Sequence, residues 1–164
     1  VLFLGCRNVF LPKTIDVGGV YYDPIKPEYV VKNLQTAYTL RDIERYKECL
    51  DRDSFKFYFD PSQSDIRDIL RDRWGIDSLS WGYNEEVISA QRLFEYAKNI
   101  VLNLTNGAKI YSSEDSETWI WDYYLKIEPA VEGQGEAVGK AIFTFVKKGN
   151  KWYIRLWQDY RSGM

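Results

Sequence analysis

The sequence predicts an α+β domain in which a curved antiparallel sheet wraps around N-terminal helices. Three long C-terminal segments, residues 118–128, 136–148 and 151–161, show the alternation of apolar and polar side chains that strands require. Gly149 and Asn150 join the last two segments as a tight hairpin, because both residues tolerate the positive φ of such turns. The aromatic faces of these strands need a cover, and the N-terminal half supplies predicted helices for it.

Apolar residues at helical spacing predict four helices, at residues 28–40, 43–50, 65–73 and 85–97. Pro27 suits the first turn of the first helix. Side-chain oxygens for N-capping precede the other three helices, at Asp42, Ser64 and Asn84. Short strands are expected at 55–59 and at 100–104, the second ended by Asn106-Gly107, and residues 75–83 are expected to form a loop.

Alternation along the strands also predicts which side chains share a face. Phe57 is central in an all-Phe face and is expected to be buried between the sheet and the first helix, near Leu34 or Tyr38. The segment 118–128 places Trp119, Trp121 and Tyr123 on one face. The segment 151–161 is expected to place Trp152, Ile154 and Leu156 on one face and Tyr153, Arg155, Trp157 and Asp159 on the other.

Composition limits the classes of function. The 164 residues are enough for one domain with a core, and the net charge of −2 without a basic stripe disfavours nucleic-acid binding. The absence of His removes the commonest general base and metal ligand. Cys6 and Cys49 lack metal-ligand spacing, so neither a metal nor a cofactor is expected, and a Cys6–Cys49 disulfide stays open.

The chain begins with four apolar residues followed by Gly5 and Cys6. This arrangement resembles the end of a bacterial lipoprotein signal peptide, in which the Cys is lipidated. The alternative is an ordinary buried N-terminal segment. The first interpretation divides the chain into a signal remnant at 1–6, an irregular segment at 7–26 and one domain at 27–164, and it predicts a lipid-anchored or periplasmic protein of the bacterial cell envelope.

The order of the predicted elements, together with several short motifs, resembles one known superfamily. The opening motifs are Ala37-Tyr38 at the end of a helix, Arg41-Asp42 between helices, and the aromatic strand 55–59; the closing motif is 149–154 followed by Trp157 and Asp159-Tyr160. Residues 27–161 are thereby similar to the nuclear transport factor 2-like superfamily, and to its small bacterial exported or lipoprotein-type members. The resemblance implies a curved antiparallel sheet closed by helices into a cone.

The resemblance leaves the function open, because this fold hosts isomerases, dehydratases, transport adaptors and ligand-binding proteins. The leading hypothesis is a non-catalytic domain whose cone binds a small apolar or ring-shaped ligand, or a partner protein. The expected ligand-pocket residues are Tyr38, Phe57, Trp121, Tyr123, Phe143 and Trp157.

Two alternatives remain. Enzymes of this superfamily place an Asp base with a Tyr or Asp hydrogen-bond donor, or a His–Asp pair, inside the cone, and the missing His excludes the second version. The candidate base is Asp122, with Tyr38 and Tyr123 as donors, and Asp159 and Tyr153 are further candidates to face a cavity. The third hypothesis is a homodimer formed through the outer face of the sheet, with apolar area from Ile120, Tyr153 and Trp157.

Overall fold

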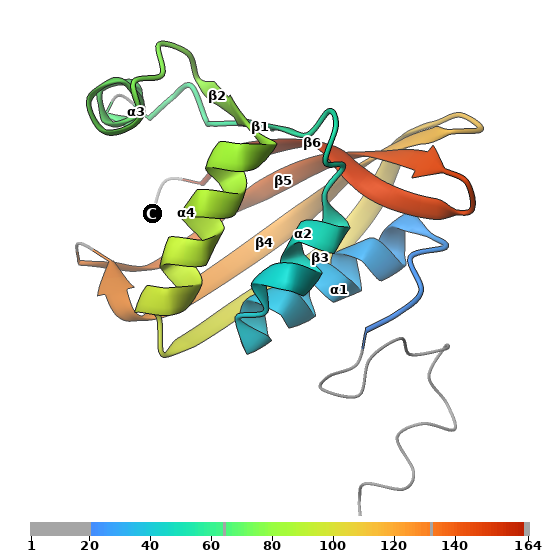
Figure 1. The fold of residues 1–164 in the computed structure, drawn as a ribbon, viewed down its shortest axis with the longest axis horizontal. Helices are drawn as coiled ribbons and strands as arrows, with labels where there is room; N and C mark the ends of the chain where they lie inside the picture. The colour runs from blue at the N-terminus through green and yellow to red at the C-terminus, as the bar shows by residue number, and fades with distance from the viewer. Residues whose placement is uncertain (1–20, 64, 132, 163–164) are drawn as a thin grey trace, which may run out of the picture.

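A computed structural model describes residues 21–63, 65–131 and 133–162 (Figure 1). Its described part contains four helices and six strands. In chain order they are α1 (Pro27–Leu40), α2 (Ile43–Cys49), β1 (Lys56–Tyr58), α3 (Ile66–Trp74), β2 (Ser80–Gly82), α4 (Tyr83–Tyr96), β3 (Asn99–Ser112), β4 (Ser116–Val131), β5 (Gln134–Lys148) and β6 (Lys151–Arg161).

All six strands form one sheet in the order β2-β1-β6-β5-β4-β3. Neighbouring strands are antiparallel except β1 and β6, which run parallel. Figure 1 shows α1, α2 and α4 against one face of the curved sheet, while α3 stands apart near β2. The arrangement confirms the predicted α+β architecture, a curved and largely antiparallel sheet wrapped around helices.

The first helices follow their sequence signals. α1 begins with Pro27 in its first turn and ends at Arg41, whose left-handed backbone (φ 54°) stops the helix. Asp42 caps α2 as predicted, because its carboxylate accepts a hydrogen bond from the backbone N–H of Arg45 at 3.1 Å. The predicted capping residue Ser64 lies outside the described residues, as does Cys6.

The start of α4 differs from the prediction. The helix begins at Tyr83, and Gly82 stands at the N-cap with its N–H bonded to the side chain of Glu85 at 3.2 Å. Asn84 therefore lies inside the helix and does not cap it. The segment expected to be a loop, residues 75–83, also contains β2, since Trp81 pairs with Phe57 of β1.

β3 is longer than predicted. Asn106 adopts a left-handed conformation (φ 54°), but instead of ending the strand it forms part of an irregularity between Thr105 and Ala108. Pairing with β4 resumes afterwards and continues to Ser112. A Cβ on Gly107 would overlap the ring of Trp121, so glycine lets this indole lie across the irregular site.

A bulge in β6 overturns the predicted alternation of this strand. Phe145 pairs with Ile154, yet the adjacent Thr144 pairs with Leu156, which leaves Arg155 as an extra residue. An extra residue reverses which side chains face the helices. Trp157 and Asp159 therefore lie on the same face as Trp152 and Ile154, and Leu156 lies on the opposite face with Tyr153.

The core lies between this face of the sheet and the helices. It includes Tyr21, which is fully buried, and Tyr22, whose backbone N–H and C=O are both bonded to the side chain of Asn33. Beside this N-terminal segment, where the N–H of Trp152 is bonded to the carbonyl of Pro24 at 2.8 Å, the predicted β5–β6 hairpin is confirmed, with Gly149 at φ +65°. None of the helices in the described ranges is long and apolar enough to cross a membrane.

Candidate functional site

Five strands each contribute one aromatic residue, in direct cross-strand register, to the helix-covered face. These residues, called here the aromatic belt, are Trp81, Phe57, Trp157, Phe143 and Trp119. The ring of Trp157 lies with its centroid 5.3 Å from that of Phe57 and 5.0 Å from that of Phe143. Such tilted and edge-on contacts are favourable geometries for aromatic rings. The belt gives the concave face a row of apolar rings that runs across five strands.

Phe57 occupies this belt, and its burial differs from the prediction. It is half-buried, and its ring contacts Phe59, Trp81 and Trp157. The face was predicted correctly, since Lys56 and Tyr58 are exposed. Full burial under α1 was wrong, because β1 is a short strand near the edge of the sheet.

Asp159 lies on the same face as Trp157, where only 15% of its side chain is exposed. Burial raises the pKa of its carboxyl group, although a hydrogen bond from the hydroxyl of Tyr123 acts in the opposite direction. Tyr123 reaches Asp159 from β4 across β5, over Gly139. A Cβ on Gly139 would stand 2.8 Å from the Tyr123 ring and would overlap the carbonyl oxygen of Tyr160. Glycine at this position therefore permits the Tyr123–Asp159 contact.

A second carboxylate, Glu86 of α4, lies deeper, with 6% of the residue exposed. Its oxygens accept hydrogen bonds from the hydroxyl of Tyr46 and from the indole N–H of Trp81, the latter at 2.7 Å. Burial raises the pKa of Glu86, against the effect of these two donors. Because both donors are neutral, no cation balances this carboxylate among its hydrogen-bond partners.

Tyr38 of α1 lies within the electrostatic range of both carboxylates. Its hydroxyl is hydrogen-bonded to that of Tyr46, and after the effect of burial the negative charges of Glu86 and Asp159 both raise its pKa. Together these side chains, with Tyr123, form what is called here the carboxylate cluster. The cluster brings two acids and three tyrosine hydroxyls to the concave side of the sheet.

The rim of the cluster contains Arg161 and Asp60. The Nε of Arg161 lies 3.6 Å from an oxygen of Asp159, and 43% of the arginine side chain is exposed. Asp60 is buried and accepts backbone hydrogen bonds from Ser62 at 2.8 Å and from Arg161 at 3.0 Å. Burial alone would raise the pKa of Asp60, but these bonds lower it. Asp60 thus serves to attach the end of β6 to the segment after β1.

Of the residues expected to line a pocket, all six lie on the helix-covered side of the sheet. Phe57, Phe143 and Trp157 belong to the aromatic belt, and Tyr38 and Tyr123 belong to the carboxylate cluster. Trp121 turns toward Gly107 of β3. Its indole N–H is buried and finds no acceptor among the described residues.

The candidate base Asp122 does not lie in the cone. It points to the opposite face of β4, its side chain is 41% exposed, and it pairs with Lys140 at 2.6 Å. Hydrogen bonds from Lys140 and Asn106 lower its pKa, whereas a base in a desolvated site needs a raised one. The prediction of Asp122 as base is therefore wrong, because strict alternation in β4 directs it away from Trp121 and Tyr123.

Sequence reasoning missed Glu86, Tyr46 and Asp60 as members or neighbours of the site. A signal for Glu86 was present, since it precedes the buried Ala90 and Phe94 at intervals of four residues along one helix face. Acidic residues in a first turn are usually explained by the helix dipole. The burial of the Glu86 carboxylate could therefore be recognised only from its neighbours in the structure.

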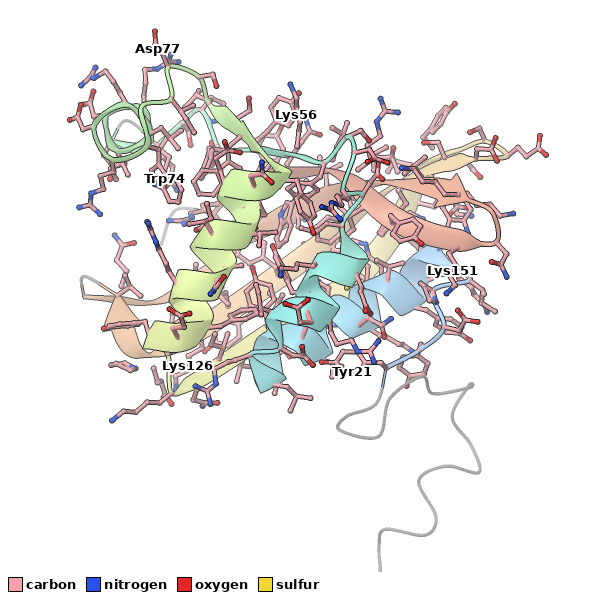
Figure 2. All side chains as sticks on the ribbon, viewed as in Figure 1. Tyr21, Lys56, Trp74, Asp77, Lys126 and Lys151 are labelled. Carbon is pink, nitrogen blue, oxygen red and sulfur yellow. The ribbon has the colours of Figure 1, made fainter. Side chains whose placement is uncertain are left out.

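The segment of α3 and β2 lies beside the open end of the belt. Trp74 at the end of α3 packs against Trp81, with ring centroids 5.0 Å apart, and the guanidinium of Arg92 lies 5.2 Å from its ring (Figure 2). These contacts connect α3 to α4 and β2. Through Trp81 they also connect α3 to Glu86.

No three His, Cys, Asp or Glu side chains converge as a metal site within the described residues. Cys49 is a free, buried thiol whose pKa is raised, chiefly by burial. It borders a cavity of about 30 Å³ on the α2 side of the molecule, next to Tyr21 and Arg45. This volume is close to that of one water molecule.

Comparisons with known proteins reveal similarity at the level of fold. No family model matches the chain, and a search of curated proteins found no match. Among solved structures, a scytalone dehydratase-like protein from Novosphingobium aromaticivorans matches with a TM-score of 0.65 at 10% identity, covering 83% of this chain and 81% of that one. A protein from Thiobacillus denitrificans that resembles the association domain of calcium/calmodulin-dependent protein kinase type II matches with a TM-score of 0.61 at 14% identity. The match covers 84% of this chain and 96% of that one.

A type 2 hexachlorocyclohexane dehydrochlorinase also matches, with a TM-score of 0.57 at 10% identity, covering 82% of this chain and 81% of that one. Identities this low establish the fold and not the activity. The chain has the nuclear transport factor 2-like cone fold, as the sequence motifs predicted.

Proposed function

We propose that the concave face of this domain binds a small ring-shaped, largely apolar molecule beside Asp159. The observation that carries the proposal is the position of this carboxylate: it is mostly buried, it adjoins the aromatic belt at Trp157, and it is hydrogen-bonded by Tyr123. Ligand sites in proteins are mostly apolar surfaces with a few polar groups that fix orientation. The aromatic belt supplies the apolar surface, and the carboxylate cluster supplies the polar groups.

The indole N–H of Trp121, which has no acceptor within the described part of the chain, is independent support. A buried donor without an acceptor costs roughly 1–3 kcal/mol, and this one lies on the same face of β4 as Tyr123. A ligand with a hydroxyl, ether or carbonyl oxygen supplies the acceptor.

A thermal-shift screen with lipids, sugars and aromatic compounds tests the proposal. We expect at least one compound to raise the melting temperature of the wild-type protein, and Asp159→Asn to reduce that shift. Asp122→Asn is the matched control, since it removes an exposed carboxylate from the other face. The proposal fails if no compound produces a shift, or if Asp159→Asn responds like the control.

A second candidate function is an isomerase or dehydratase with Asp159 as general base. It is favoured by the burial that raises the pKa of Asp159 toward that of a catalytic base, while the hydrogen bond from Tyr123 orients the carboxylate and opposes part of that rise. In this mechanism the carboxylate removes a proton from carbon while a tyrosine hydroxyl stabilises the developing oxyanion. The dehydratase-like and dehydrochlorinase neighbours have the same fold.

Proton exchange distinguishes the two candidates. An enzyme of this type should catalyse deuterium incorporation from D₂O into carbonyl compounds that bind, followed by NMR. Asp159→Asn should lower that rate by about 10²–10⁴-fold, the usual contribution of a general base. Binding without exchange favours the non-catalytic function.

We further propose that the protein is exported and anchored at the bacterial envelope through Cys6. The support is the sequence Gly5-Cys6 after an apolar run. In a bacterial host fed an alkyne fatty acid, the chain with its native leader should become labelled, and Cys6→Ser should not. Equal labelling of both chains, or of neither, contradicts the proposal.

The outer face of the sheet supports a third proposal, homodimerisation. No helix in Figure 1 covers this face, and Ile120 lies directly opposite Ile142 on it. Trp157, expected to contribute here, lies on the inner face because of the β6 bulge. Sedimentation equilibrium should detect a dimer that Ile142→Lys dissociates and that Arg67→Ala, at an exposed position of α3 away from this face, leaves intact. A wild-type monomer at tens of micromolar, an order-of-magnitude choice for moderate interfaces, contradicts the proposal.

A further inference from the structure

The charged residues inside the fold are all of one sign. Every buried charged residue in the described part of the chain is an acid, namely Asp51, Asp60 and Glu86. Asp159 is a fourth acid with little exposure. Burial of charge is costly unless a partner of opposite charge or several hydrogen bonds compensate it. The four acids therefore differ in function according to how each is compensated.

Two of the four acids are compensated and act structurally. Asp51 pairs with Lys148 at 2.5 Å at the β5–β6 hairpin. Asp60 accepts two backbone N–H groups, from Ser62 and Arg161. Burial alone would raise the pKa of both carboxyl groups, but these partners lower it. Both side chains fasten neighbouring segments and require no further cation.

Glu86 and Asp159 are less well compensated. Among the described residues, Glu86 is bonded by the neutral donors Tyr46 and Trp81 and by no cation. Asp159 accepts a hydrogen bond from the hydroxyl of Tyr123, and it is paired with Arg161, whose Nε lies 3.6 Å away and whose charge lowers its pKa. The two carboxylates of the concave face therefore have one partner cation between them, at the exposed rim, which leaves one negative charge unbalanced.

The surroundings of Asp159 favour positive charge for a second reason. Trp157 precedes it on the same face, with the rings of Phe57 and Phe143 packed against the indole. The faces of aromatic rings carry negative quadrupoles and attract ammonium and guanidinium groups. The protein already uses this interaction nearby, where Arg92 lies over Trp74. Both the carboxylates and the rings of this face therefore select against an anionic ligand.

We infer that the molecule bound beside Asp159 is a small organic cation, an amine or quaternary ammonium group carried on a ring. The inference rests on the ligand-binding function proposed above and specifies the charge of that ligand. The cationic nitrogen pairs with the carboxylate of Asp159, and the ring packs on Trp157. Arg161, whose side chain is 43% exposed at the rim, must give up its pairing with Asp159 when the ligand enters.

Three probes built on the same phenylethyl group test the charge directly. Calorimetric titration at low salt compares 2-phenylethylamine, 2-phenylethanol and 3-phenylpropanoate, which carry a cation, no charge and an anion on the same ring. We expect the amine to bind roughly 10–100-fold more tightly than the alcohol, as for a hydrogen bond to a charged group. The carboxylate should bind most weakly.

Three variants test whether Asp159 is the group that selects the cationic probe. Asp159→Asn should weaken the amine by at least about 10-fold and leave the affinity of the alcohol unchanged, which also shows that the variant is folded. Arg161→Ala keeps the backbone N–H that Asp60 requires, removes the competing cation, and should therefore strengthen binding of the amine. Asp122→Asn is the control for the overall charge of the protein. It should change the affinity for neither the amine nor the alcohol, because the carboxylate of Asp122 lies on the outer face.

Two outcomes overturn the inference. If the alcohol or the carboxylate binds as tightly as the amine, the site is not selective for cations, and the proposed ligand-binding function survives without this refinement. If none of the three probes binds, or if Arg161→Ala weakens the amine, the inference is wrong. The broader thermal-shift screen then decides separately whether the concave face binds any ligand.

Discussion

Replacement of Phe57 by Ala tests the register of β1 and the aromatic belt together. Deleting a fully buried Phe costs about 3–5 kcal/mol. Phe57 is half-buried on a short strand, but its ring contacts three others, those of Phe59, Trp81 and Trp157. We therefore expect Phe57→Ala to lower the free energy of unfolding by about 2 kcal/mol, roughly half the core value.

Urea unfolding, followed by tryptophan fluorescence and circular dichroism, measures this loss. With an m-value of about 2 kcal/mol/M, typical for a small domain, the midpoint should fall by about 1 M. Lys56→Ala is the matched control, because the adjacent side chain is exposed, and it should change stability by less than about 0.5 kcal/mol. Equal small losses in the two variants would refute the assigned register of β1, and with it the aromatic belt.

Three further predictions concern other buried positions. Gly139→Ala should destabilise the fold by about 1–3 kcal/mol, the usual cost of overpacking, because its Cβ would overlap the carbonyl oxygen of Tyr160; a midpoint equal to that of the wild type contradicts this. Burial raises the pKa of Glu86 above 4.5, so the stability it contributes is complete below that pH and is lost as the pH rises through the folded-state value. Urea unfolding at several pH values should therefore show the wild type losing stability relative to Glu86→Gln above pH 4.5, whereas a constant difference would be inconsistent. Cys49 is buried with a raised pKa, so in a Cys6→Ser background it should react with iodoacetamide only after unfolding; rapid labelling of the folded protein would oppose the structure.

The local signals in the sequence identified most elements correctly. Pro27 begins α1 and Asp42 caps α2, because N-terminal helix geometry depends on a few adjacent residues. Gly149 forms the hairpin between β5 and β6 for the same local reason. Alternation in β4 separated the inner Trp121 and Tyr123 from the outer residues. These features are encoded within a few positions along the chain.

The composition of the site depended on contacts between distant segments. Alternation in β6 alone did not reveal the bulge at Arg155, since a bulge appears only when the partner strand is known. The bulge places Asp159 and Trp157 on the face of the sheet that the helices cover. Asp122 was the candidate base from the sequence, but it lies on the outer face and pairs there with Lys140. The sequence of a strand shows that its two faces differ. The fold decides which face the helices cover and which residues of other strands lie beside it.

By itself, the sequence determined the α+β class and the order of helices and long strands, because these follow from periodicity and turn chemistry along the chain. Its short motifs added the resemblance to a superfamily with a cone fold. Only the tertiary structure decided that Glu86 and Asp159 both lie close enough to Tyr38 to raise its pKa. These three residues come from α4, β6 and α1, and no spacing in the sequence relates them. Desolvation of a carboxylate is a property of its surroundings in space, so the charge of the concave face emerges only when helices and sheet are packed together.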